Sequence, residues 1–178
     1  MRKPDRIAIG ATFLLAAACT SAREPVESGP ILPEVSLAAA IRIAGQREPG
    51  WIPVAAGTRS EQAGTYDVAL LSKGLVRETS VDAATGQLTE VQERPVRAGY
   101  EDLAGRLEAE LPGAPIDLAG AAEMAASSFP ERRTVGIEVE PSGERLVYRV
   151  SFLSGGERSA VRIDVATGAL EALEAESR

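Results

Sequence analysis

The side chains that most often carry out catalysis or bind metals are scarce in this chain. It contains no His and a single Cys, Cys19. His-assisted Ser or Cys nucleophiles, imidazole proton shuttles and His metal ligands are therefore excluded. A lone Cys can form neither an internal disulfide nor a thiolate zinc site. The 26 acidic residues leave carboxylate catalysis formally open, but they form no pattern typical of a site. We therefore expect a non-enzymatic protein without catalytic residues, bound metal or cofactor.

Two segments look like sites because they are charged and repeated, Asp82-Ala83-Ala84-Thr85-Gly86 and Asp164-Val165-Ala166-Thr167-Gly168. A structural role explains them better. The Asp carboxylate would accept backbone N–H bonds across a turn, and the Gly would take the positive φ that closes a hairpin. A calcium site would need several acidic oxygens at alternating positions, and neither segment has them. We therefore assign structural turn roles to Asp82, Thr85, Gly86, Asp164, Thr167 and Gly168.

The chain begins with a segment typical of export. Residues 1–6 carry a net positive charge, and the uncharged stretch 7–18 is too short to span a bilayer as a helix. The sequence Leu15-Ala16-Ala17-Ala18-Cys19 resembles the lipobox of bacterial lipoproteins, with Ala16 where Leu is usual. This predicts a signal peptide over 1–18, acylation of Cys19, and anchoring to the cell envelope facing the periplasm or exterior. The alternative is ordinary cleavage after Ala22, which would give a soluble exported protein.

The segment 19–34 contains three Pro with Ser and Gly between them, and we interpret it as a tether. Removing residues 1–18 takes away three basic residues and one acidic residue, which changes the formal charge from −7 to −9. An acidic chain without basic clusters argues against nucleic-acid binding.

The rest of the chain contains an internal repeat. SLAAAIRIA at 36–44 matches DLAGAAEMA at 117–125, YDVALL at 66–71 matches YRVSFL at 148–153, and VDAATGQL at 81–88 matches IDVATGAL at 163–170. The helical segments are 81 residues apart and the strand segments 82, which suggests one inserted residue between Ala125 and Thr134. Three matches in the same order predict a tandem duplication.

Each copy has the pattern of a helix followed by strands. Apolar residues at i, i+3, i+4 and i+7 predict one buried helix face, and Ser36 and Asp117 stand at N-cap positions. Alternating residues such as Tyr148, Val150 and Phe152 predict half-buried strands. The first strand of copy one, near 52–56, is too poorly patterned to fix its register.

The fold class we expect is α+β. It consists of two tandem repeats, each with one helix on a three- to four-stranded antiparallel meander, with a short last strand after the Thr-Gly turn. The predicted boundaries are 35–95 for repeat 1, 96–113 for a connecting segment with a helix over 100–111, and 114–176 for repeat 2. Because modules of this size are marginal alone, we expect the copies to pack together.

A helix rich in small residues, a Tyr-x-Val strand and an Asp-x-x-Thr-Gly turn together resemble the PepSY domain over 36–91 and 117–173. The family usually has Pro after the Asp, where this chain has Ala83 and Val165. The resemblance implies a non-catalytic extracytoplasmic module of the kind found in peptidase propeptides and envelope proteins. It also implies a fold similar to the repeats of the β-lactamase inhibitor protein.

Two loops at matching places are candidates for partner contact, at Trp51 and at Arg132-Arg133. Trp51 could anchor a partner or fold back onto the helix end, whereas the two arginines are interpreted as solvated, as is the acidic tail with Glu171, Glu174 and Glu176. We expect binding to another protein, a peptidase or envelope sensor, through sheet faces and through edges doubled by the duplication. A structural or assembly lipoprotein without inhibitory activity is the alternative.

Overall fold

The computed structural model describes residues 35–58, 64–171 and 174–175. All of them belong to one compact unit, Leu32–Arg178. The predicted signal peptide, Cys19 and the tether up to residue 34 lie outside the described residues.

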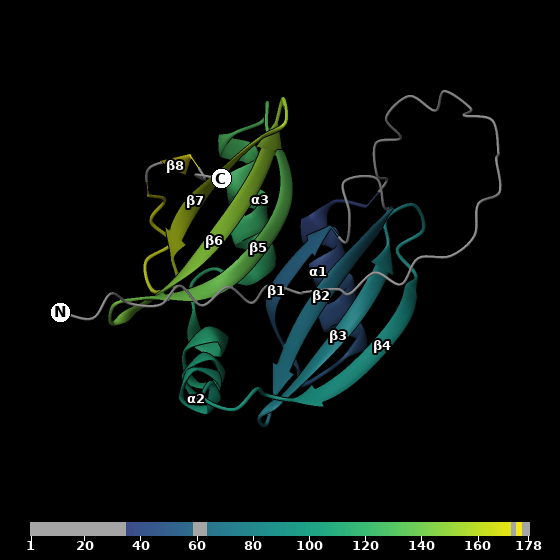
Figure 1. The fold of residues 1–178 in the computed structure, drawn as a ribbon, viewed down its shortest axis with the longest axis vertical. Coiled ribbons are helices and arrows are strands. Elements are labelled where there is room, and N and C mark those ends of the chain that lie inside the picture. The colour runs from purple at the N-terminus through teal and green to yellow at the C-terminus, as the bar shows by residue number, and fades with distance from the viewer. Residues whose placement is uncertain (1–34, 59–63, 172–173, 176–178) are drawn as a thin grey trace. The chain divides into compact units, whose positions relative to one another are not determined.

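The chain is an α+β protein with three α-helices and an eight-stranded antiparallel sheet among its described residues (Figure 1). In chain order the elements are α1 (Leu37–Arg47), β1 (Ile52–Thr58), β2 (Thr65–Ser72), β3 (Leu75–Asp82), β4 (Leu88–Pro95), α2 (Glu101–Glu110), the 3₁₀ helix η1 (Leu111–Gly113), α3 (Leu118–Ser128), β5 (Arg133–Ser142), β6 (Arg145–Ser154), β7 (Glu157–Asp164) and β8 (Glu174–Ala175).

The two halves of the chain contribute to one continuous sheet. Its strand order is β4-β3-β2-β1-β5-β6-β7-β8, and β1 pairs antiparallel with β5 through Ala55↔Glu138, Ala56↔Ile137 and Gly57↔Gly136. The expectation that two copies double the available sheet edge is wrong for these strands, because β1 and β5 use their outer edges to pair with each other. Backbone N–H and C=O groups hold β1 and β5 together. Because nearly every residue type carries the same backbone groups, the sequence does not indicate this pairing.

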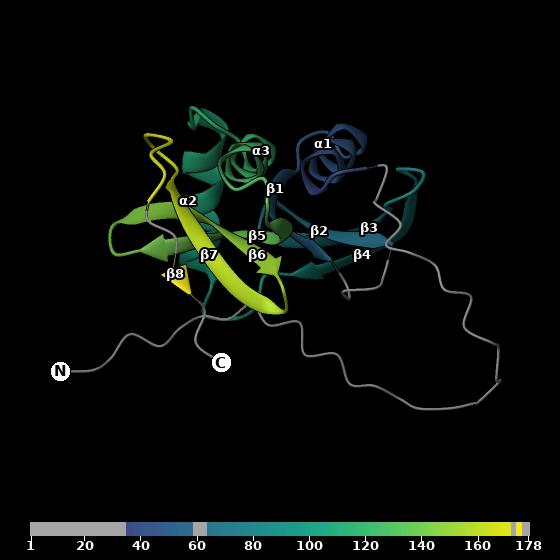
Figure 2. The same cartoon turned by 90° about the horizontal axis from the view of Figure 1, so that it is seen from above.

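Both long helices begin at the predicted caps. The Oγ of Ser36 accepts a hydrogen bond from the Ala39 N–H at 3.1 Å, and the Oδ1 of Asp117 accepts one from the Gly120 N–H at 2.7 Å. Each cap satisfies a donor that the first helical turn would otherwise leave unpaired. As Figure 2 shows, α1 and α3 lie side by side on the same face of the sheet.

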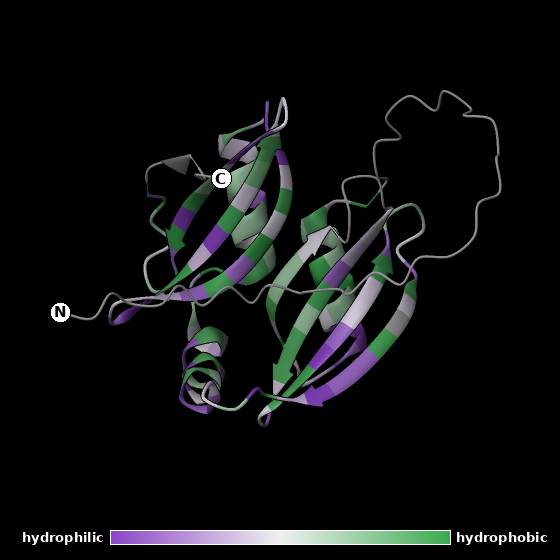
Figure 3. Ribbon diagram, in the orientation of Figure 1, coloured by the Kyte–Doolittle hydropathy of each residue, from purple (hydrophilic) through white to green (hydrophobic). Residues whose placement is uncertain are grey.

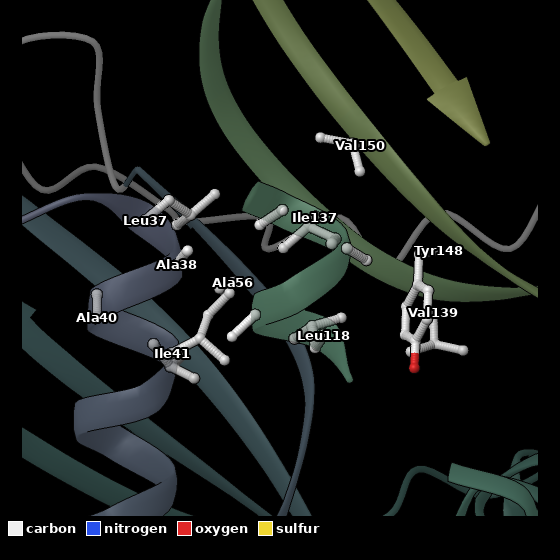
Figure 4. Close-up of a cluster of buried hydrophobic side chains, with 14 of the residues drawn as sticks. Leu37, Ala38, Ala40, Ile41, Ala56, Leu118, Ile137, Val139, Tyr148 and Val150 are labelled. Carbon is white, nitrogen blue, oxygen red and sulfur yellow. The ribbon is translucent and has the colours of Figure 1, made fainter. Parts of the chain in front are cut away.

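The core lies between these helices and the sheet. Ile41 of α1, Leu118 of α3, Ala56 of β1 and Ile137 of β5 belong to one buried cluster (Figure 4). The apolar faces of both helices are rich in Ala. These short side chains let the helices approach the strands and each other closely.

The helix predicted over 100–111 is α2, followed by the single turn η1. It is attached to one end of both halves. Glu108 accepts a hydrogen bond from the Gly74 N–H, at the tip of the β2–β3 hairpin, at 3.1 Å. Arg106 donates to the Glu144 carbonyl, in the β5–β6 turn, at 2.6 Å. The connecting helix therefore ties two hairpin tips that are far apart in sequence.

Two strands differ from the predictions. In β1 a register shift between Pro53 and Ala55 marks a bulge, and this irregularity is why its alternation could not be read from the sequence. After the first Thr-Gly turn, β4 is eight residues long instead of short. After the second turn, Leu170 forms only an isolated bridge and β8 has two residues.

Candidate functional site

The first Asp-x-x-Thr-Gly segment forms a tight turn between β3 and β4. The Oδ1 of Asp82 accepts hydrogen bonds from the backbone N–H of Ala84 at 3.0 Å and of Thr85 at 2.8 Å, and from the Thr85 hydroxyl at 2.8 Å. Gly86 has φ of +70° and donates its N–H to the Asp82 carbonyl at 2.8 Å. The carboxylate is thus occupied within its own loop.

The second segment repeats this geometry and adds an ion pair. The Oδ1 of Asp164 accepts from the backbone of Ala166 and from the N–H and hydroxyl of Thr167, and Gly168 again has φ of +70°. Here the aspartate side chain is only 6% exposed, and its Oδ2 lies 3.0 Å from the Arg145 guanidinium.

Arg145 also reaches Glu171 at 3.3 Å beside a depression of about 390 Å³. Glu171 therefore pairs with Arg145 while its side chain stays partly exposed, an ion pair that the interpretation of a solvated tail did not include. Of the other two tail residues, Glu174 lies in β8 and Glu176 is outside the described residues.

Hydrogen bonds determine the protonation state of the aspartate carboxylate in each turn. The Thr85 hydroxyl and then the Thr85 N–H lower the pKa of Asp82. The Thr167 hydroxyl likewise lowers the pKa of Asp164, with smaller contributions from the Thr167 N–H and Arg145. Both carboxylates are charged at neutral pH and act as acceptors, which is the opposite of what a general acid requires.

Trp51 folds back beside the end of α1. Trp51 is half-buried against the core, and its backbone N–H donates to the Glu48 carbonyl at 3.1 Å. The Arg77 guanidinium lies over the indole ring, 4.1 Å from the ring centroid, and pairs with Glu48 and Glu93. This cation–π arrangement covers one side of the ring, so Trp51 is not a freely exposed anchor.

The two neighbouring arginines have different surroundings. Arg132 is half-buried and donates from Nη1 to the Ser159 hydroxyl at 2.9 Å, so the expectation that it is simply solvated is wrong. Arg133 is exposed and is the first residue of β5, not part of the loop before it. The structure does not bring Trp51 and this pair into a common cluster.

Within the described part of the chain, no group of three or more His, Cys, Asp or Glu side chains is placed to hold a metal ion. No helix over the same residues is long and apolar enough to cross a membrane.

Comparison with known proteins identifies the second half. Residues 115–174 match the family model described as "Peptidase propeptide and YPEB domain", known as PepSY. No curated protein matches the chain significantly.

Two solved structures resemble the fold. The crystal structure of CD1622, a candidate lipoprotein from Clostridium difficile 630, has a TM-score of 0.53 and 15% identity, covering 80% of this chain and 94% of that one. The YpmB protein from Bacillus subtilis has a TM-score of 0.33 and 15% identity, covering 77% and 95%. At 15% identity, the similarity to CD1622 shows that the two chains share a fold and nothing more.

The segment that matches the PepSY model contains α3, β5, β6 and β7, and therefore the Asp164 turn and the β5 side of the β1–β5 junction. The sheet face turned away from α1 and α3 is called here the open face (Figure 2). Side chains alternate along a strand, so the residues next to the buried ones belong to it. At its centre Gly57 pairs with Gly136 across the junction. Asp67 on β2 lies opposite Gly57, Ser151 on β6 lies opposite Gly136, and Ala69 lies opposite Ala55 in the neighbouring row.

Charged residues surround this central area of small residues. Arg94 pairs with Glu78 in the first half, and in the second half Arg149 pairs with Glu138 and Arg162 with Glu140. Alternation in the sequence predicted the outward positions of β2, β5, β6 and β7, but it did not fix those of β1. Nothing in the sequence indicated the junction that makes Gly57 and Gly136 neighbours.

Proposed function

We propose that this chain is an exported, non-catalytic protein-binding module built from two copies of one PepSY-type unit, with the open face as its binding surface. The observation that carries the proposal is the open face itself. One sheet spans both halves, and α1 and α3 cover one side of it. The other side has Gly57, Gly136, Ala69 and Ser151 near its centre, with Asp67 beside Gly57 and charged pairs around them.

Strand registers support the duplication. Tyr66 pairs with Thr58 and Val81, and Tyr148 pairs with Val139 and Ile163, at corresponding positions of β2 and β6. The β1 bulge falls at Val54 and the β5 bulge at Val135, which are 81 residues apart. The two bulges are 81 residues apart, as the helices are, whereas Tyr66 and Tyr148 are 82 apart. An inserted residue would therefore lie after the bulge in β5, before Tyr148, and not between Ala125 and Thr134.

The junction has the character of a pseudo-twofold axis. Ala56 pairs with Ile137, and Arg42 of α1 forms a two-pronged ion pair with Glu123 of α3, with Nη2 and Oε2 2.7 Å apart. Each pair joins positions 81 residues apart, as expected when two copies of one unit face each other.

An open sheet face that spans both halves suits a macromolecular partner better than a small ligand. Small-molecule sites are concave and enclose most of the ligand, whereas a stable protein interface needs on the order of 800 Å² per partner. The PepSY description links the family to peptidase propeptides, and we propose an extracytoplasmic peptidase or envelope regulator as the partner. The charge of −9 after residue 18 favours a partner with a basic face, so association should slow as salt rises.

The binding test uses a matched pair of substitutions. Ala69 lies on the open face and Ala126 is exposed on α3, on the helix side. Ala69→Arg places a bulky cation against the partner and should weaken binding at least about tenfold, whereas Ala126→Arg should change it less than about twofold. Binding would be measured by surface plasmon resonance against peptidases and sensor ectodomains from the source envelope, with peptidase activity followed in parallel.

Equal binding by the two variants would refute the open face as the surface. If an activity that turns over a peptide or ester substrate copurifies with the chain, the non-catalytic assignment is refuted. Binding without inhibition would favour the structural or assembly role instead.

We further propose that acylated Cys19 anchors the protein to the envelope. Cys19→Ser should move the protein from the membrane to the soluble fraction. A mature N-terminus at Arg23 in intact-protein mass spectrometry would contradict lipidation.

A further inference from the structure

We infer that the β4 edge of the sheet pairs with the β4 edge of a second copy of this chain, antiparallel and centred on Gln92. β4 is eight residues long and ends the sheet, and no described strand pairs with its outer side. The opposite end of the sheet is β8, with two residues, so β4 is the longer of the two edges. β4 lies at the edge of the sheet in Figure 1, and Figure 3 colours its last part as hydrophilic. Val91, in the middle of β4, is 50% exposed.

The direction of the backbone groups along β4 follows from one hydrogen bond. The Val96 N–H donates to the Gly74 carbonyl at 2.9 Å, so even-numbered residues of this segment point their backbone groups toward β3. In an antiparallel pair the direction alternates from residue to residue. The N–H and C=O of Val91 and Glu93 therefore point outward, away from β3.

A second copy can satisfy these outward groups. When Gln92 lies opposite Gln92 of the second copy, Val91 lies opposite Glu93 of that copy. Residues that both point outward then exchange both of their backbone hydrogen bonds, as an antiparallel ladder requires.

Charge selects this register over its neighbours. With Gln92 at the centre, position 94 lies opposite position 90 of the second copy, and the sequence has arginine and glutamate there. Arg94 is half exposed on the open-face side, where Glu78 is its partner within the chain. Centring on Glu93 would set two carboxylates opposite each other, which is destabilising. Centring on Val91 would set Arg94 opposite Leu88.

The same device already joins the two halves of the chain. β1 and β5 pair edge to edge around Ala56 and Ile137, with α1 and α3 on one face. A twofold axis through Gln92, perpendicular to the sheet, would likewise keep the helices of both copies on one face. The result is a closed dimer, because the equivalent residues pair with each other.

The pairing is short. Pro95 has no N–H and ends the ladder at the C-terminal end of β4. The register shift between Leu88 and Glu90 ends it at the N-terminal end. A ladder of this length buries less than the area of a standard stable interface. We therefore expect a weak, concentration-dependent dimer with Kd above about 10 µM.

The test is sedimentation equilibrium of the full chain carrying Cys19→Ser, which removes lipid-driven association, from about 1 µM to about 1 mM. Val91→Pro deletes an outward N–H and leaves the β3–β4 bonds intact, so Kd should rise at least about tenfold. Val91→Thr keeps the N–H and the β-branched shape, and should stay within about threefold of the parent.

A charge exchange tests the register. Glu90→Arg and Arg94→Glu should each raise Kd about tenfold, and the double variant should return to within about threefold of the parent. Circular dichroism would verify that each variant is folded. A monomer at every concentration, a dimer insensitive to Val91→Pro, or a double variant that fails to recover would overturn the inference. These outcomes are independent of partner binding through the open face.

Discussion

The turn glycines offer a matched pair of perturbations, Gly86→Ala and Gly168→Ala. Both residues have φ of +70°, a conformation that costs an L-residue about 1–2 kcal/mol. Their surroundings differ. A Cβ on Gly168 would meet Ile116 Cγ2 at 3.8 Å, an ordinary contact, whereas one on Gly86 would meet Ile43 Cδ1 at 3.1 Å.

The two costs should therefore differ in a defined order. Gly168→Ala should lower the free energy of unfolding by about 1–2 kcal/mol through backbone strain, less the smaller gain from a stiffer unfolded chain. Gly86→Ala carries the same strain, and the Ile43 Cδ1 methyl must also move by a few tenths of an ångström, which should add up to about 1 kcal/mol.

Urea unfolding at neutral pH, followed by far-UV circular dichroism, measures both variants. In thermal unfolding followed by the same signal, the Tm should fall by about 2–4 °C for each kcal/mol lost. Gly168→Asn is the control, because Asn tolerates the left-handed region, and it should cost less than Ala. A Gly168→Ala variant as stable as the parent would refute the strain argument. Equal losses in the two Ala variants would refute the contribution of Ile43.

Three further predictions concern buried polar groups and pH. The Tyr148 hydroxyl donates to the Ile116 carbonyl at 2.8 Å, and burial, followed by the charge of Asp117, raises its pKa to about 12. Tyr148→Phe should cost about 1 kcal/mol at pH 7. Because the raised pKa favours the neutral form, the parent should lose extra stability between pH 10 and about 12 in urea titrations, and the variant should not. The pKa values of Asp82 and Asp164 are lowered, so their stabilisation is complete above the unfolded-state value of about 4 and is lost as the pH falls through the folded-state values. Asp82→Asn/Asp164→Asn should flatten the acid limb of urea midpoints, and an unchanged limb would contradict this. Finally, the buried Thr79 hydroxyl has no hydrogen-bond partner among the residues that the structure describes, so Thr79→Val should raise stability by about 1 kcal/mol in urea unfolding, and a loss would reveal a partner.

The sequence alone was sufficient for features whose interactions lie within a few residues. Ser36 and Asp117 cap their helices through N–H groups three residues away. In the turns, Asp82 and Gly86 meet within five residues. Strand alternation around Tyr148 follows from the period of two, because each strand has one face against the helices. These signals depend on side-chain type at short spacing, so they can be read without knowing the fold.

Tertiary structure decided how the halves meet. The β1–β5 junction joins Gly57 to Gly136 through backbone groups, and every residue type but Pro carries the same backbone donor and acceptor. The position of Trp51 beneath Arg77 likewise depends on β3 passing beside the end of α1. Composition and spacing set which groups were available, but only strand order brought residues so distant in sequence into contact.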